Sequence, residues 1–539
     1  MAPQTSADTS LTQSPSTMED IELLFTLLCF LSETHIPISM LHRGALGTHY
    51  WTTDGSLVPL ESSLNDRLKR LVLDRSLLDL ALQQLAGQDL VNFSDNGQTC
   101  ILARNRRTER LQFLSPEACR YWQIEALRLV FNGIPVKYAC KWDMNLEKSF
   151  LKEHICHTVC AIRDSDGYDA IPVDLRSLIG TGLLESSFYP DRRWKVFSIG
   201  EAQELVRITE GPYLHTSFRH RQSVLRRVQP QGDTRNSNPF PQGVVPAQLP
   251  NPSNRKQHAL FGRGKYQDAM DYFQIEQLAK TTEILNQWQP LLPASVLEDI
   301  VWCEINLFKG KVLRFRGQLQ QSLECLEQVR RLMLVRDDMF WEEMTGTVAC
   351  EIADTLLCLG HFSEIERPLD AVPSSSRYSL DIRATSRIIL AECFFAQGVL
   401  PDVKRHLDAI KEDCAAQARR PVEGSHEIDE VAGLSKQNKL RFYILAAKLA
   451  HSQGQWDIAI EGWIMALEKI NAIPLTSGYA ARVLHLSQLN ILRRINQQAL
   501  AEKCIEEVHR LEELSKQSEA ICWIPPLAEW EHYLVETLC

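Results

Sequence analysis

One short stretch of the sequence contains several side chains of the types that bind metal ions. In HICHTVC, at residues 154–160, two histidines and two cysteines lie close together. On a helix, Cys156 and Cys160 would share a face, and His157 would lie beside Cys160. Zinc takes four convergent ligands, usually from separate elements, and no second cluster of this kind is evident in the sequence. We therefore interpret the stretch as a packed helix face, with zinc binding as the alternative, and expect no cofactor.

Several patterns approach known catalytic or nucleotide-binding motifs and lack an essential residue. His426-Glu427 is followed by Glu430 where H-E-x-x-H has its second histidine, and Gly433-Leu434-Ser435 lacks the last glycine of G-x-S-x-G. Gly264-Lys265-Tyr266 and Gly310-Lys311-Val312 have neither the glycine spacing nor the Ser/Thr of a phosphate-binding G-x-x-x-x-G-K-[ST] loop. We therefore expect no catalytic residues, no bound nucleotide and no enzymatic activity.

A glycine pattern recurs over residues 257–539. A large apolar or aromatic residue, such as Trp456, stands two positions after each of Gly264, Gly317, Gly360, Gly398 and Gly454. Small residues stand seven positions before the last four glycines, namely Gly310, Ala353, Ala391 and Ala447. Glycine permits the left-handed residue that ends a helix, and small side chains let two antiparallel helices approach closely. The pattern predicts successive helix pairs, with residues 481–511 as a last degenerate pair or a capping helix.

This pattern resembles the tetratricopeptide repeat (TPR), and residues 446–467 are its best copy. The resemblance implies a helical-repeat solenoid whose first helices line a concave, partner-binding face. That places a basic track on the concave face, consisting of Lys311, Arg314, Arg441, Lys448 and His451. Such a track would hold a partner's acidic segment or C-terminal carboxylate. The alternative is a solvated helix face.

The N-terminal part has the pattern of a different module. Apolar spacing predicts helices over 21–31, 64–73 and 77–86, the last closed by Gly87. Two apolar runs then flank Asn96-Gly97, the strongest short-range hairpin signal. Three helices followed by a hairpin are typical of a winged helix. We expect a tail at 1–18, a winged-helix-like domain at 19–115 and a helical connector at 116–228.

A linker is expected at residues 229–256, where six prolines occur and large apolar residues are few. From Arg219 to Lys256 there are seven Lys/Arg and a single acid, Asp233, so the linker is basic.

Together these parts resemble the C-terminal half of NB-ARC/TPR proteins of the NLR-like class, including those of filamentous fungi. The residues that carry the likeness are those at 21–44, 76–93 and 148–162, besides the repeats. In that class a winged helix follows a P-loop ATPase module, which is not found in this sequence. The nucleotide switch of the class is therefore not expected here.

Composition narrows the class of protein further. The 539 residues include 44% hydrophobic side chains and have a net charge of -10, which excludes a wholly disordered chain and a surface generally suited to nucleic acid. The 15 cysteines are scattered without a C-x-x-C pair, so we expect reduced, mostly buried thiols. No apolar run reaches the roughly 20 residues of a membrane span. We expect a cytoplasmic protein, a nuclear location being the alternative.

The leading hypothesis for function is a non-enzymatic scaffold or adaptor that binds protein partners through its repeats. The first alternative is a transcriptional regulator that binds DNA through the winged helix. Its reading helix at 76–86 has no positive charge, and the candidate phosphate contacts are Arg104, Arg106, Arg107 and Arg110. The second alternative is an accessory component of a fungal biosynthetic pathway, with chemistry that no motif reveals.

Overall fold

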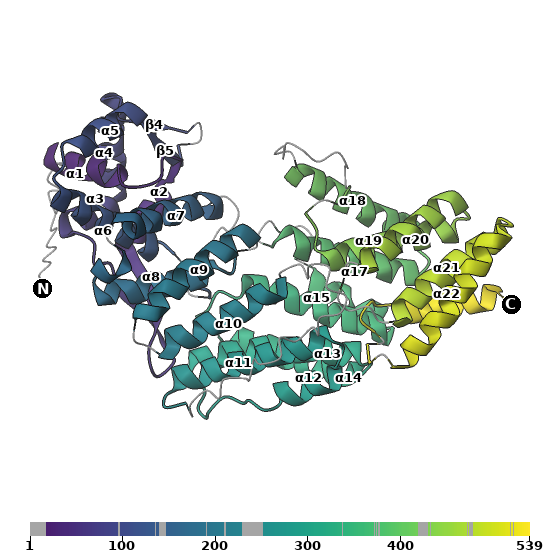
Figure 1. Ribbon diagram of the computed structural model, residues 1–539. Coiled ribbons are helices and arrows are strands. Elements are labelled where there is room, and N and C mark those ends of the chain that lie inside the picture. Colours follow the sequence, from purple (N-terminus) through teal and green to yellow (C-terminus); the bar gives the residue numbers. More distant parts are fainter. Residues whose placement is uncertain are drawn as a thin grey trace, which may run out of the picture. The chain divides into compact units, whose positions relative to one another are not determined.

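The chain is mainly helical, as predicted, with a few short strands (Figure 1). The computed structural model describes residues 18–94, 97–134, 136–138, 147–165, 167–189, 191–209, 212–228, 252–336, 338–370, 372, 375, 378–418, 430–431, 433–471, 473, 478–517, 519–520 and 522–538. The chain divides into two compact units, Met1–Gln248 and Leu249–Cys539. The boundary falls inside the predicted linker. That linker (up to residue 251) and the predicted tail (up to residue 17) lie outside the described residues.

The first unit begins with helices around a small sheet. Its elements are α1 (Met18–Leu28), β1 (Ile36–Pro37), α2 (Ile38–Leu46), β2 (Gly47–Trp51), β3 (Leu57–Glu61), α3 (Asp66–Leu73), α4 (Arg75–Gly87), β4 (Val91–Phe93) and β5 (Thr99–Leu102). The antiparallel order is β1-β5-β4, and β2 pairs with β3 as a separate hairpin. Asn65 and Asp74 begin α3 and α4, because their side chains accept hydrogen bonds from the first free backbone N–H groups.

Two elements of this part were missed in the sequence. Helix α2 is short and contains Gly44, and the hairpin β2–β3 interrupts the predicted order of three helices. The hairpin predicted at Asn96-Gly97 is present as β4 and β5, and Gly97 has a φ of +66°. Helix α4 ends at Gly87, close to the prediction, but the left-handed residue that follows the helix is Asp89, with a φ of +56°.

Helices make up the rest of the first unit. They are α5 (Arg104–Gln112), α6 (Pro116–Asn132), α7 (Glu147–Ser165), η1 (Tyr168–Ala170), α8 (Val173–Ser186), α9 (Arg192–Ile208) and α10 (Pro212–Val228). One hydrophobic cluster joins side chains from both parts of the unit, from Leu24 and Leu82 to Val130, Ile155 and Ile179. The predicted winged-helix-like and connector segments therefore share a continuous core.

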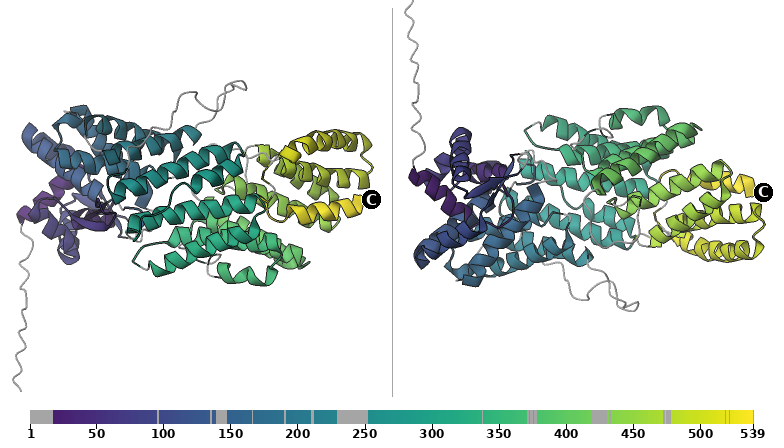
Figure 2. Two further views of the ribbon diagram at one scale, coloured as in Figure 1. Left: turned by 90° about the horizontal axis from the view of Figure 1, so that it is seen from below. Right: turned by 90° about the horizontal axis from the view of Figure 1, so that it is seen from above.

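The second unit consists of helix pairs in succession (Figure 2). They are α11 (Arg255–Gln274) with α12 (Leu278–Leu285), α13 (Val296–Phe315) with α14 (Leu319–Val335), α15 (Glu342–Leu359) with η2 (Phe362–Glu364) and α16 (Glu366–Leu369), α17 (Leu380–Ala396) with α18 (Leu400–Ala418), α19 (Lys436–Ser452) with α20 (Trp456–Asn471), and α21 (Gly478–Arg494) with α22 (Gln498–Gln517). Helix α23 (Leu527–Leu538) follows them. Helix α11 already begins at Arg255, so the last two residues of the predicted linker are helical.

The turn between the helices of a pair has a left-handed residue. Gly317, Gly360, Gly398 and Gly454 have φ values of +72°, +74°, +76° and +70°, as the pattern requires. Gly264 was assigned wrongly, because it lies inside α11. The left-handed residue of the first pair is Glu276 (φ +58°), with Ala269 seven positions before it and Thr281 five positions after it. The last pair has Asn496 (φ +58°) at this position.

Small residues bring the paired helices close together. A Cβ atom on Gly310 would lie 2.7 Å from the Leu326 side chain of the partner helix. In the same way, a Cβ on Gly462 would lie 2.9 Å from the Ala447 Cβ. The Ser322 hydroxyl donates to the Gly310 carbonyl oxygen at 2.7 Å, which fixes the register of α13 and α14. Backbones can approach this closely only where side chains are small.

Membrane spans were also sought in this fold. Within the described part of the chain, no helix combines the length and the apolar character needed to cross a bilayer.

Glu276 and Gly317 hold the same left-handed position in their helix pairs, so substitutions at the two should change stability in opposite directions. Glu276→Gly is expected to stabilise the second unit by about 1 kcal/mol, because it relieves a left-handed non-glycine residue. Gly317→Ala is expected to destabilise it by about 1 kcal/mol for the converse reason. Urea unfolding of the full chain, followed by circular dichroism, measures both changes. Effects of the same sign at the two positions would contradict the assignment of Glu276 to this register.

Candidate functional site

Residues 522–538 fold back onto the first helices of the pairs, and we call them the return segment. The Cys522 backbone N–H donates to the Phe315 carbonyl oxygen at 3.0 Å, at the end of α13. From there the segment extends to α19 and α21, where α23 packs. We call the sides of α13, α15, α17, α19 and α21 that meet the return segment the inner face.

The inner face holds the return segment through its backbone. The Arg314 Nη1 donates to the Cys522 carbonyl oxygen at 3.0 Å, and the Lys448 Nζ donates to the Pro526 carbonyl oxygen at 3.4 Å. Both donors are buried, on α13 and α19. Buried donors to a backbone carbonyl can hold a segment whatever its side chains are, because every residue has this acceptor.

Trp530 of α23 is the aromatic anchor of the segment. Its ring lies 5.2 Å from the His451 ring and 5.9 Å from the Trp463 ring, between centroids, and its Nε1–H donates to the Ser487 hydroxyl at 2.9 Å. The Lys448 Nζ lies 5.7 Å from the centre of the same ring, a cation–π contact. Trp530 is 4% exposed, so the inner face encloses it almost completely.

A chain of buried ion pairs runs beneath the segment, from α13 to α19. Glu351 accepts from Arg314 at 2.8 Å and lies 3.3 Å from the Lys311 Nζ. The Asp354 carboxylate lies 3.5 Å from the Arg314 Nη2 and receives both terminal nitrogens of Arg441, at 2.9 and 2.8 Å. This bidentate geometry is the strongest form of the pair.

Glu392 on α17 is the third acid of this chain. Its Oε2 accepts from the Arg441 Nη2 at 2.5 Å, while its Oε1 is buried and has no hydrogen-bond partner among the described residues. Burial therefore raises the pKa of Glu392 in spite of Arg441. Burial would raise the pKa of Glu351 too, but Lys311 and Arg314 outweigh it and lower that pKa to about 2.

Burial also controls the bases of the inner face. It lowers the pKa of Lys448 to about 8, and that of His451 to about 4. The His451 Nε2–H donates to the Asn490 Oδ1 at 3.1 Å, and its buried Nδ1 has no hydrogen-bond partner within the described part of the chain. A proton on Nδ1 would find no acceptor among those residues, so the neutral imidazole fits the site.

The predicted basic track is therefore not an open surface. Its residues do come from α13 and α19, but Arg314, Arg441, Lys448 and His451 are buried, and only Lys311 is partly exposed. The alternative of a solvated helix face is wrong for those four residues as well. Acids of the intervening helices pair with the two arginines, and the return segment covers the rest.

The cluster at 154–160 is a packed face of α7. The His154 Nδ1 accepts from the Ser32 N–H at 3.1 Å, and its Nε2 lies 3.0 Å from the His35 carbonyl oxygen. Burial lowers the pKa of His154 to about 4. Cys156 and Cys160 lie one turn apart on α7, and their thiols interact with each other. In the described part of the chain, no group of three or more His, Cys, Asp or Glu could hold a metal ion.

The arginines offered as phosphate contacts lie in α5, directly after β5. Arg106 pairs with Glu109 at 3.1 Å and Arg110 with Glu22 at 2.8 Å. Arg107 is buried, with its Nη2 lying 3.1 Å from the His157 Nε2. Arg104 lies 3.7 Å from Glu33. All four therefore have partners within the unit.

Sequence reasoning missed the acids and the return segment. Glu351, Asp354 and Glu392 lie inside apolar helices, where a charge is unusual without a partner. The return segment has a recognisable pattern, since Leu527, Trp530 and Leu534 share one face of a helix. A pattern of this kind shows an amphipathic helix but not the surface on which it packs.

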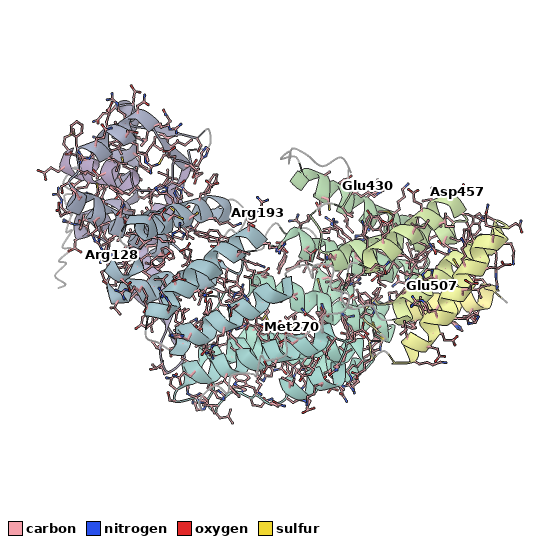
Figure 3. All side chains as sticks on the ribbon, in the orientation of Figure 1. Arg128, Arg193, Met270, Glu430, Asp457 and Glu507 are labelled. Carbon is pink, nitrogen blue, oxygen red and sulfur yellow. The ribbon has the colours of Figure 1, made fainter. Side chains whose placement is uncertain are left out.

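Arg441 provides a test of the ion-pair chain. Arg441→Met leaves the buried Glu392 without its cation and Asp354 with only the 3.5 Å contact to Arg314, so we expect a loss of about 3–5 kcal/mol in unfolding free energy. Adding Glu392→Gln to that variant should restore part of the loss. The control is Arg510→Met, which removes an exposed ion pair with Glu507 on α22 (Figure 3) and should leave stability unchanged. Urea unfolding measures each variant, and equal effects at Arg441 and Arg510 would contradict the buried network.

His451 makes stability depend on pH. Its pKa falls from 6.5 to about 4 on folding, so the unfolded chain binds the proton first as the pH drops. The stability that His451 contributes to the folded state is fully present above pH 6.5 and is lost as the pH falls toward 4. Compared with His451→Gln, the wild type should lose about 3 kcal/mol more between pH 7 and pH 4. Unfolding at several pH values measures this difference, with His509→Gln, at an exposed position, as the control. Parallel pH profiles for wild type and His451→Gln would show that the site does not exclude the proton.

No protein-family model matches this chain, and no curated protein matches it. The function is therefore inferred from the contacts of the site itself. These are a peptide segment held by its backbone, an aromatic anchor, and a row of buried ion pairs beneath them.

Proposed function

We propose that the second unit is a TPR-like protein-interaction scaffold, without enzymatic activity, whose inner face binds a peptide segment of a protein partner. The observation that carries this proposal is the way in which the return segment is held. Arg314 and Lys448 donate to its carbonyl oxygens, and Phe315 accepts from its N–H. On the side of the segment, these contacts use only backbone atoms, so a partner's segment can make them too.

The return segment indicates the chemistry of that partner. A stretch of bends and a turn, Cys522 to Pro526, is followed by a helix with Trp530 on its inner side. Acids flank this tryptophan: the charge of Glu529 acts on Lys448, and Glu531 pairs with Arg482 of α21. We therefore expect the partner to present an acidic segment with an aromatic anchor. Hot spots of this kind are typically large aromatic side chains in enclosed pockets.

The first unit is proposed to be winged-helix-like. The sheet order β1-β5-β4 and the helices around it support this proposal. Since the arginines of α5 are paired with acids or histidine of the same unit, packing within the chain is favoured over DNA binding. The relationship to NLR-like proteins, and a cytoplasmic or nuclear location, are parts of the same proposal.

A peptide-exchange experiment tests the scaffold function. A fluorescent peptide with the sequence of residues 519–538 is titrated with the full chain, and polarisation is measured. In the wild type, the chain's own segment competes at a high effective concentration. Trp530→Ala in the chain weakens that competitor, so we expect this variant to bind the peptide at least about tenfold more tightly than the wild type.

Variants of the inner face show where the peptide binds. Adding Lys448→Met to the Trp530→Ala chain should reduce peptide affinity by roughly tenfold, because a backbone contact and a cation–π contact are lost. Adding Lys404→Met, at an exposed position on α18, should have no effect. If the Trp530→Ala chain is folded by circular dichroism and binds no peptide, the proposed function is wrong.

A further inference from the structure

Two cysteines meet where the return segment begins. Cys358 lies near the end of α15, and Cys522 is the first residue of the return segment. Both lie near Arg314, whose Nη1 donates to the Cys522 carbonyl oxygen at 3.0 Å and whose Nη2 lies 3.5 Å from Asp354, one helical turn before Cys358 on α15. The two thiols interact with each other, and both residues are partly exposed. An S–S bond of about 2 Å joins the sulfur atoms of a disulfide, so adjacent thiols need only a small movement to form one.

The surroundings give the two thiols different roles. Arg314 donates to the Cys522 carbonyl oxygen at 3.0 Å, and its positive charge acts on both sulfur atoms. The interaction with the Cys358 thiol lowers the pKa of Cys522 to about 7, burial opposes this, and Arg314 adds to it. The same interaction, with burial, raises the pKa of Cys358. These surroundings favour the thiolate at Cys522 over the thiolate at Cys358, and the thiolate is the reactive form of cysteine.

Other cysteines differ from this pair. Burial raises the pKa of Cys303, Cys325 and Cys350, which lie in the helical core of the same unit. The thiols of Cys156 and Cys160 also interact with each other, but both residues lie on α7. A bond between them would join residues that one helix already holds together.

We propose that Cys358 and Cys522 form a peroxide-sensitive pair, whose disulfide locks the return segment onto the inner face. This inference rests on the proposed function, because the lock regulates something only if the inner face also receives a partner's segment. With both thiols reduced, a partner can displace the return segment. With the disulfide formed, residue 522 is tied to α15 and displacement is blocked.

The oxidation is a balanced reaction with hydrogen peroxide. The Cys522 thiolate attacks one peroxide oxygen, the O–O bond breaks, and Cys522 becomes a sulfenic acid while hydroxide leaves. The Cys358 sulfur then attacks the Cys522 sulfur, an S–S bond forms, and a second hydroxide leaves. The two thiol protons and the two hydroxides give two waters. Two cysteines are oxidised, one peroxide is reduced, and a dithiol restores the thiols by exchange.

The first test measures the disulfide itself, independently of peptide binding. The full chain is treated with hydrogen peroxide at pH 7, remaining thiols are alkylated, and tryptic peptides are analysed by mass spectrometry. We expect a linked pair that contains Cys358 and Cys522, reversed by dithiothreitol and absent from Cys358→Ser and Cys522→Ser. Cys160→Ser, in the other pair of interacting thiols, should form the link at the wild-type rate. If both cysteines remain alkylatable while other thiols are oxidised, the proposal is overturned.

The second test measures the lock. Chymotrypsin cleavage after Trp530 or Tyr533 requires the return segment to leave the inner face, so oxidation should slow this cleavage roughly tenfold. Cys522→Ser, treated in the same way, should show no change. Equal cleavage of the oxidised and reduced wild type would overturn the lock even where the disulfide forms.

Peptide exchange separates the two proposals. Oxidised Trp530→Ala chain should bind the fluorescent peptide of residues 519–538 at least about tenfold more weakly than the same chain after reduction. If the reduced chain binds no peptide, the proposed function fails, while the linked peptides and the cleavage rates still report on the lock. If the reduced chain binds and the oxidised chain binds equally well, the lock fails and the scaffold function stands.

Discussion

The second unit depends on a row of charges inside its helices. Arg314 and Arg441 each face acids of the next helices, so that α13, α15, α17 and α19 are joined by ion pairs rather than by apolar contacts alone. Removing two charges from water is costly, and the pair offsets that cost only with close geometry and further hydrogen bonds. The bidentate contact of Arg441 with Asp354 provides such geometry. The helices are therefore held in a register in which these groups meet.

The same charges position the groups that hold the return segment on the inner face. While the Nη2 of Arg314 is held by its carboxylate partners, its Nη1 is directed at the carbonyl oxygen of Cys522. Lys448 has no carboxylate in hydrogen-bond contact among the described residues, and it uses the Pro526 carbonyl and the Trp530 ring instead. Burial favours its neutral form, and the nearby charges of Glu392 and Glu529 oppose that effect. The ion pairs of the array and the contacts to the return segment thus share the same side chains.

One arginine also connects the ionic row with the thiol pair. Arg314 touches the backbone of Cys522, and its charge favours thiolates at Cys522 and Cys358 alike. A structural ion pair and a contact to the return segment therefore meet at the end of α13. The reversible disulfide proposed at this junction would decide whether the return segment can leave the inner face: its formation holds the segment, and its reduction permits release.

The sequence by itself determined the helical class and most of the repeat register. Glycine and small residues impose local conformations and close approach, and these depend on the residue itself, as at Gly317 and Gly310. The glycine pattern did not identify the left-handed residue of the first helix pair, because that residue is Glu276. Tertiary packing tolerates the conformational cost of a left-handed residue other than glycine. The sequence also left open whether the basic residues of α13 and α19 faced water or a partner.

Only the tertiary structure decided what those basic residues contact. Arg441 meets Asp354 and Glu392 from helices more than forty residues away in the chain, and a pattern in one helix carries no information on such partners. The meeting of Cys358 with Cys522 has the same origin, since the return segment must first fold back along the inner face. Local conformation depends on residue type, whereas burial and ion pairing depend on which distant residues the fold brings together.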